Sequence, residues 1–145
     1  MHWPASGSDQ GSPVKEVAAV GNALRTMRVV LDGMSDAVVA TDMRGQIVYV
    51  NDAACGILQF PREQLLGRSI ERFGEDPAHG ATQDAILRAA LDAGQWDGEV
   101  INVARDGSQI VFHSRVRLLR DAAGGPVGLL GVSTDITERK RAEAE

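Results

Sequence analysis

Two strand-forming runs in the C-terminal half are joined by a tight-turn sequence, and this hairpin restricts the fold more than any other feature. Residues 99–104 and 109–119 are rich in Val, Ile and Leu, and Arg105-Asp106-Gly107-Ser108 separates them. An Asp-Gly pair between two such runs is a strong hairpin signal. A third run, residues 127–134, follows a second Gly-rich turn. The C-terminal half therefore predicts three consecutive antiparallel strands.

Two shorter runs near the middle of the chain supply the remaining strands. Residues 37–41 and 46–50 flank Asp42-Met43-Arg44-Gly45, which predicts a second hairpin. Asn51-Asp52 then predicts the start of a short helix, and residues 82–93 predict a longer helix that ends at Gly94. This order predicts an α+β fold, in which a five-stranded antiparallel sheet carries helices across one face.

A heptad pattern precedes the first strand. Its apolar residues alternate at spacings of three and four, as in a coiled-coil seam: Val17, Val20, Leu24, Met27, Leu31 and Met34. We expect an amphipathic helix over residues 14–34, after a flexible Gly/Ser-rich lead-in over residues 1–13. Three heptads are typical both of a helix packed on its own domain and of a dimer seam, parallel or antiparallel, so both interpretations stay open.

The C-terminal end predicts a connector. The globular domain is expected over residues 35–135, and residues 136–145 are strong helix formers behind Asp135, a good N-cap. This helix has one large apolar side chain, Ile136, and helices below about 12–15 residues are marginal without packing. We therefore expect it to continue into a further domain.

Composition excludes several classes of function. The net charge of -5 argues against a nucleic-acid surface, and the single Cys argues against a disulfide framework or a multi-cysteine metal site. Apolar runs are too short to span a membrane, so a cytoplasmic setting is expected. The chain lacks a Gly-x-Ser-x-Gly elbow, a Gly-rich phosphate loop and a His-Glu-x-x-His pair, so we expect neither an enzyme nor a metal site.

Six motifs in order give a family resemblance. The chain resembles a PAS domain with its C-terminal PAC segment through residues 36–42, 45–53, 64–67, 96–100, 105–108 and 131–139. The resemblance implies a sensor or relay module of a signalling protein, such as a two-component histidine kinase or a diguanylate cyclase. It also implies that Asp135, Ile136 and Thr137 begin the connector to a covalently linked output domain.

The resemblance leaves the cofactor open. Light-sensing members form a flavin adduct through a Cys, and the matching position here is Ile70. Haem-binding members use a His ten or eleven residues before the Gly that ends the long helix, whereas His79 precedes Gly94 by fifteen. Trp96-Asp97-Gly98 matches a motif of some FAD-binding members. We expect no cofactor; FAD is the alternative, with Trp96 and Asn102 as its contacts, and haem fits less well.

The hairpin register predicts which residues meet a pocket. A two-residue Asp106-Gly107 loop would pair Arg105 with Ser108. One sheet face, the core face, would then hold Ile101, Val103, Ile110, Phe112, Val116 and Leu118. The other face would hold Trp96, Val100, Asn102, Val111, His113 and Arg115.

A small organic ligand between sheet and helices is a further expectation. Its candidate contacts are Ala85, Ala89, Glu99, Ile101, Phe112 and Ser114. The outer sheet face mixes apolar and basic residues, whereas a solvent-exposed sheet face would be more polar. We therefore expect the helix over residues 14–34 to cover it, in the same chain or in a homodimer.

Overall fold

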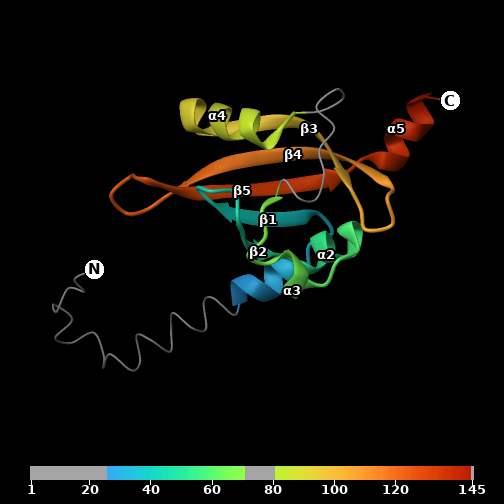
Figure 1. The fold of residues 1–145 in the computed structure, drawn as a ribbon, viewed down its shortest axis with the longest axis horizontal. Helices are drawn as coiled ribbons and strands as arrows, with labels where there is room; N and C mark the ends of the chain where they lie inside the picture. The colour runs from blue at the N-terminus through green and yellow to red at the C-terminus, as the bar shows by residue number, and fades with distance from the viewer. Residues whose placement is uncertain (1–25, 71–80, 145) are drawn as a thin grey trace.

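A five-stranded antiparallel sheet forms the centre of the computed structural model, which describes residues 26–70 and 81–144. The strands lie in the order β2-β1-β5-β4-β3. They are β1 (Ala37–Asp42), β2 (Ile47–Val50), β3 (Gln95–Val103), β4 (Gln109–Arg120) and β5 (Pro126–Asp135). The helices are α2 (Asp52–Leu58), α3 (Arg62–Leu65), α4 (Gln83–Ala93) and α5 (Thr137–Ala144). Figure 1 shows α4 beside β3 and β4, and α5 projecting beyond the end of β5. The predicted fold class is confirmed.

The N-terminal helix is described only in its last turns. Residues 26–32 are helical, and the chain turns at Gly33 before β1. Of the heptad positions, Met27 is exposed, and Leu31 and Met34 are half-buried. The rest of the expected helix, residues 14–25 with Val17, Val20 and Leu24, lies outside the described residues.

The β3–β4 hairpin closes one residue differently from the expectation. The Gly107 N–H donates to the Ala104 carbonyl at 2.9 Å, and Gly107 has a φ of 88°, so the loop contains three residues, Arg105 to Gly107. A turn followed by a residue in the left-handed region is the usual three-residue hairpin loop. Val100 therefore pairs with Phe112, where the expectation paired Ile101 with Phe112.

A one-residue shift moves every side chain of β3 to the opposite face. The predicted orientation of the β3 side chains is therefore wrong, whereas the predicted orientation of the β4 side chains is confirmed. Val100 is 3% exposed on the helix side, and Trp96 and Asn102 face the same way. Glu99, Ile101 and Val103 face outward.

Helices α2 and α4 begin, and α4 ends, where the sequence predicts. The Asn51 side chain caps α2 by accepting from the Ala54 N–H at 3.0 Å, and Thr82 caps α4 by accepting from the Ala85 N–H at 3.2 Å. Gly94 ends α4 with a φ of 80°. Ile86 is the large buried side chain of α4, and it packs with Val100 and Val116 of the sheet. A second cluster joins the sheet to α2 and α3 through Ala37, Ile47, Val50, Ala54, Leu58, Leu65 and Phe112.

Candidate functional site

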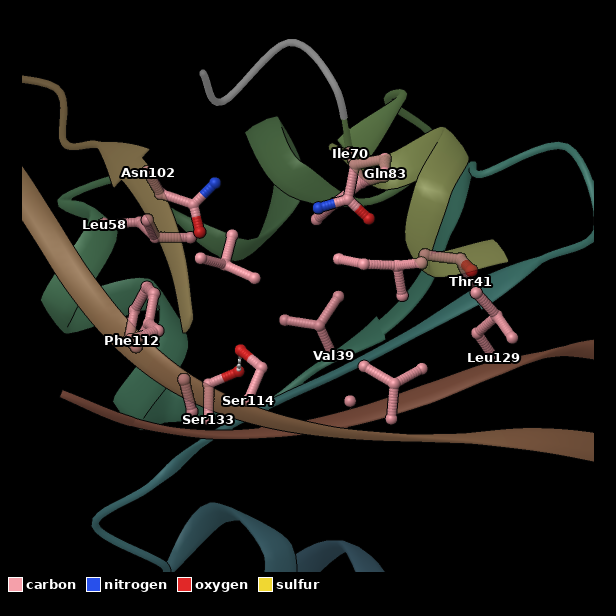
Figure 2. A pocket seen from close by; sticks show the side chains of 15 residues that line it. Val39, Thr41, Leu58, Ile70, Gln83, Asn102, Phe112, Ser114, Leu129 and Ser133 are labelled. Carbon is pink, nitrogen blue, oxygen red and sulfur yellow. Dashed lines mark hydrogen bonds between the residues drawn. The ribbon is translucent and has the colours of Figure 1, made fainter. Parts of the chain in front are cut away.

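A cavity of about 80 Å³ lies between the sheet and the helices (Figure 2). Four strands supply most of its wall: Ala37, Val39 and Thr41 from β1, Val100 and Asn102 from β3, Phe112, Ser114 and Val116 from β4, and Leu129, Gly131 and Ser133 from β5. Leu58 of α2, Ile70, and Gln83 and Ile86 of α4 complete the described wall. The cavity exists because small residues on the central strands, such as Ala37 and Gly131, leave space that the helices do not fill.

A pair of hydroxyl groups marks the floor of the cavity. The Ser114 and Ser133 hydroxyl oxygens lie 2.7 Å apart across β4 and β5, and Figure 2 shows both side chains directed into the cavity. Ser114 is 6% exposed and Ser133 is half-buried, so the pair is partly shielded from bulk water. Buried hydroxyls in contact with each other keep hydrogen-bonding capacity for a third group.

Of the expected pocket residues, those on β4 line the described cavity, and those on α4 and β3 do not. Phe112 and Ser114 of β4 line the cavity, whereas the described wall does not include Ala85, Ala89, Glu99 or Ile101. Ala85 is exposed, and Ala89, three residues after Ile86, is half-buried without lining the described cavity. Glu99 and Ile101 point outward because of the hairpin register. Whether Phe112 and Ser114 bind a ligand stays a prediction.

The two expected flavin contacts occupy the helix side of the sheet, contrary to the register prediction. Asn102 lines the cavity, while Trp96 packs beside it against Ile86, Val100 and Val116. The Trp96 ring covers Gly98, where an added Cβ would lie 2.7 Å from a ring carbon. The histidine considered for haem, His79, lies outside the described residues.

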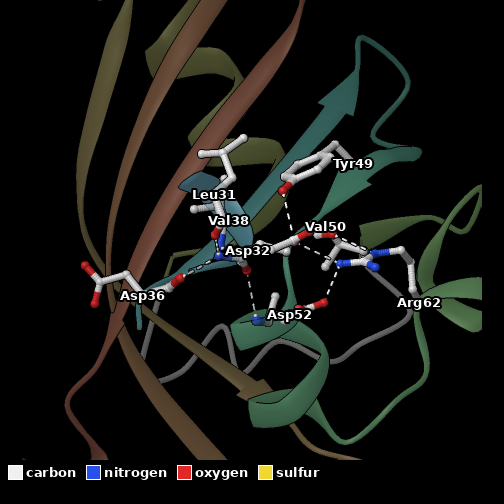
Figure 3. A network of polar contacts seen from close by, with 10 residues as sticks. Leu31, Asp32, Asp36, Val38, Tyr49, Val50, Asp52 and Arg62 are labelled. Carbon is white, nitrogen blue, oxygen red and sulfur yellow. Dashed lines mark hydrogen bonds and ion pairs between the residues drawn. The ribbon is translucent and has the colours of Figure 1, made fainter. Parts of the chain in front are cut away.

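Asn51 joins the N-terminal helix to the domain. It lies next to the contacts of Asp32, Tyr49 and Arg62, which Figure 3 shows. Its side chain is fully buried, and its amide oxygen accepts from the N–H groups of Val38 and Ala54. Its amide nitrogen donates to the carbonyls of Leu31 and Asp36, each at 2.9 Å. One amide therefore ties the end of the N-terminal helix, its linker, β1 and α2 together.

Arg62 adds charged contacts at the same place. Its guanidinium lies 3.0 Å from the Asp32 carboxylate and 2.7 Å from that of Asp52, and its Nε–H donates to the Val50 carbonyl. The Tyr49 hydroxyl donates to Asp32 at 3.4 Å. Burial and the Asp32 charge raise the pKa of Tyr49. We call Asp32, Tyr49, Asn51, Asp52 and Arg62 the N-terminal junction.

The other end of the sheet holds α5 by its first turn. The Asp135 carboxylate accepts from the Thr137 N–H and hydroxyl, at 3.0 and 2.6 Å. The Thr137 hydroxyl oxygen accepts from the Val111 N–H of β4, and the Ile136 N–H donates to the Val111 carbonyl. The expected N-cap Asp135 thus holds the start of α5, with Thr137 as the link to the sheet.

One ion pair further along α5 joins this helix to the sheet. The Lys140 ammonium is 2.9 Å from the Glu99 carboxylate of β3, and both side chains are partly exposed. This hydrogen bond and the Glu99 charge raise the pKa of Lys140. Glu99, expected in the pocket, contacts α5 instead. We call Asp135, Ile136, Thr137 and Lys140, with Val111 and Glu99 of the sheet, the C-terminal junction.

A groove of about 490 Å³ crosses the outer sheet face. Met34 and Asp36 form one side of it, and strand residues including Arg115, Arg117, Leu130 and Val132 form the rest. The segment between the N-terminal helix and β1 therefore borders the outer face. We call this surface the outer groove.

Comparisons with known proteins agree with the fold and with the motifs. The family model described as "PAS domain" matches residues 35–138. The chain is 32% identical over 123 residues to the methanogenesis regulatory histidine kinase FilI of Methanothrix harundinacea, covering 83% of this chain and 14% of that protein. Over 117 residues it is 26% identical to sporulation kinase C of Bacillus subtilis, covering 80% of this chain and 27% of the kinase.

A solved structure supports the same assignment. The crystal structure of the PAS domain of a protein from Colwellia psychrerythraea superposes with a TM-score of 0.72 at 26% identity, covering 81% of this chain and 99% of that one. In the described part of the chain, no helix has the length and apolar character to cross a membrane. The family match over residues 35–138 shows that this chain belongs to the PAS domain family.

Proposed function

We propose that this chain is a sensory or signal-relay module that passes a change at its cavity to an output domain through α5. The observation that carries the proposal is the path of β5. Gly131 and Ser133 of this strand line the cavity, and Asp135, two residues after Ser133, holds the first turn of α5. A change in the cavity wall therefore acts on the strand that leads directly into the connector helix.

Strand β4 supplies the second half of the relay. Ser114 pairs with Ser133 across the cavity floor, and Val111, three residues earlier, bonds to Ile136 and Thr137. A relative shift of β4 and β5 would alter both the cavity and the anchor of α5. Such coupling requires two states in which these contacts differ.

The relatives suggest the kind of output domain. FilI and sporulation kinase C are kinases by name, and this chain spans 14% and 27% of their lengths. We propose that α5 leads into a histidine-kinase-type output domain, that this module is not itself catalytic, and that it works in the cytoplasm.

Substitution at the C-terminal junction tests the relay. In the full-length protein, Thr137→Val removes the hydroxyl that links α5 to Val111 while keeping the side-chain shape. We expect at least about a threefold change in basal kinase autophosphorylation, as for loss of one hydrogen bond. Thr134→Val, on β5 but outside the junction, is the matched control and should leave autophosphorylation unchanged. Equal autophosphorylation by the Thr137→Val and Thr134→Val variants would contradict the proposal that α5 relays the signal.

We further propose that the module forms a homodimer through its N-terminal helix and the outer groove. Met27, Val29 and Val30 on the described turns of this helix are 61%, 73% and 60% exposed. Three large apolar side chains on one short helix are typical of an interface, and a second copy presents the same surface. Their burial in a dimer would also cover the half-apolar outer face.

Light scattering of the purified chain tests the dimer. We expect a dimer that Met27→Glu weakens by at least about tenfold, because a charge would be buried at the seam. Arg28→Gln, on the same helix, lowers the net charge by the same one unit and is the control for a change of charge alone. A monomeric unsubstituted chain at high concentration would overturn this part of the proposal.

A flavin-binding sensor is the second candidate function. It is favoured by Asn102, which lines the cavity, and by Trp96, which lies on the same sheet face. The described cavity of about 80 Å³ is small for this cofactor, since pockets for drug-sized ligands are about 300–1,000 Å³. The visible absorption spectrum of the purified protein separates the two candidates, because only a bound flavin colours the preparation yellow.

A further inference from the structure

The described wall of the cavity carries no charge. Its polar side chains are the hydroxyls of Thr41, Ser114 and Ser133 and the carboxamides of Gln83 and Asn102. Every other described residue of the wall is apolar. An ion that entered this cavity would lose its hydration and meet no opposite charge on these residues.

The cavity is also small. Its volume of about 80 Å³ is well below the range of about 300–1,000 Å³ for sites that enclose drug-sized ligands. Branched and aromatic side chains such as Val39, Leu58 and Phe112 surround it. The shape and chemistry of the wall therefore suit a compact ligand with a branched apolar part.

The Ser114–Ser133 pair determines which polar group such a ligand carries. Each hydroxyl has one donor and two acceptor sites, and the contact at 2.7 Å uses one donor and one acceptor of the pair. One donor and several acceptor sites remain. A group that both donates and accepts, such as a primary amide or an alcohol, satisfies them, whereas a carboxylate can only accept.

We propose that the cavity binds a small, uncharged, branched amide or alcohol, held by the Ser114–Ser133 pair. This inference rests on the proposed sensory function, since it names the ligand class of the same cavity. It also places the polar end of the ligand on the two strands that hold α5, because Ser133 and Ser114 belong to β5 and β4.

A matched pair of probes tests the ligand class. Isobutyramide and isobutyrate have the same size and shape, and only isobutyrate is ionised at neutral pH. The purified chain is titrated with each probe to about 10 mM, a range suited to ligands of this size, and binding is followed by amide NMR shifts. We expect isobutyramide to shift the amides of residues 112–116 and 129–133 and to bind at least about 100-fold more tightly than isobutyrate.

Two variants locate the site. Ser133→Ala removes one hydroxyl and should weaken isobutyramide binding by about five- to tenfold. Gly131→Ala should weaken it by about fivefold by filling space. An added Cβ at Gly131 would lie 3.7 Å from the Val39 carbonyl oxygen and 3.8 Å from a Val116 methyl carbon, so the methyl group fits without a clash. Thr134→Val, whose side chain lies on the outer face, is the control and should bind isobutyramide as the unsubstituted chain does.

The outcomes separate this inference from the proposed function. Equal or tighter binding of isobutyrate, or absence of binding by both probes, overturns the ligand class, while the output of Thr137→Val still decides the relay. Isobutyramide shifts in the cavity without any shift in residues 135–144 would support the ligand class and count against the relay. Unchanged affinity in Ser133→Ala would overturn the role of the hydroxyl pair.

Discussion

The two junctions hold their helices in different ways. The N-terminal junction is built from side chains, with a fully buried Asn51 that makes four hydrogen bonds and an Arg62 that bridges Asp32 and Asp52. The C-terminal junction consists of a few bonds around the first turn of α5, a helix with no buried residue in its described length. We infer that the N-terminal helix is fixed to the domain, whereas α5 is the end that responds to a change in the sheet.

The largest expected effect is at Asn51. Asn51→Ala would leave two N–H donors and two carbonyl acceptors without their partner, so we expect a loss of about 3 kcal/mol or more in the free energy of unfolding. Thr82→Ala also removes an N-cap but breaks one such bond, and about 1 kcal/mol is expected. Urea denaturation measures both. Similar losses would mean that the additional bonds of Asn51 contribute little.

The second largest loss of stability is expected when an ion pair of Arg62 is removed, and it should differ between the two carboxylates that Arg62 contacts. Asp32→Asn should cost about 1 kcal/mol in unfolding free energy, because this partly buried pair holds the N-terminal helix. Asp52→Asn, with a 66% exposed side chain, should cost about half as much. Amide exchange adds a local readout, since only Asp32→Asn should speed exchange in residues 26–34. Faster exchange there in both variants would contradict a specific role for Asp32.

A smaller effect is expected at Thr137. Thr137→Val should lower the free energy of unfolding by only about 0.5 kcal/mol, because the freed Val111 N–H is only partly buried and can bond water. The ellipticity that α5 contributes should fall with little change in the sheet. A loss of unfolding free energy as large as that of Asn51→Ala would show that the C-terminal junction is part of the rigid core. This result would contradict the inferred difference between the two junctions.

The smallest effect concerns the Lys140–Glu99 pair. Because the pKa of Lys140 is raised, the contribution of the pair is complete below the pKa of an unfolded lysine, about 10.4, and is lost as pH rises through the higher folded value. Glu99→Gln should speed amide exchange in α5 by no more than about twofold at neutral pH. NMR titration of the Lys140 side chain checks the pKa, and a pKa unchanged by Glu99→Gln would rule out the pair in solution.

Local patterns predicted the elements well, and long-range contacts less well. Asn51, Thr82 and Gly94 are helix boundaries that sequence alone identifies, because capping depends on neighbours along the chain. The Asn51 contacts with Leu31 and Asp36, and the Arg62 contact with Asp32, join residues far apart in sequence and leave no periodic signal.

The prediction of which β3 residues line the pocket depended on one turn. Arg105-Asp106-Gly107-Ser108 is compatible with a loop of two or three residues, and this difference decides the face of every side chain on β3. The Asp106 carboxylate accepts from the Ser108 N–H and hydroxyl, which stabilises the longer loop. An acidic residue before Gly and a hydroxyl residue after it is the signal that would have favoured this register.

Amide hydrogen exchange resolved at single residues tests the central claim most directly. The account predicts that the amides of Val38 and Ala54, bonded to Asn51, exchange only through global unfolding, whereas the amide of Lys140, bonded to Ile136 in α5, exchanges at least about 100-fold faster. Equal protection of Lys140 and Val38 would contradict it, because α5 would then belong to the rigid core and could not respond to the cavity.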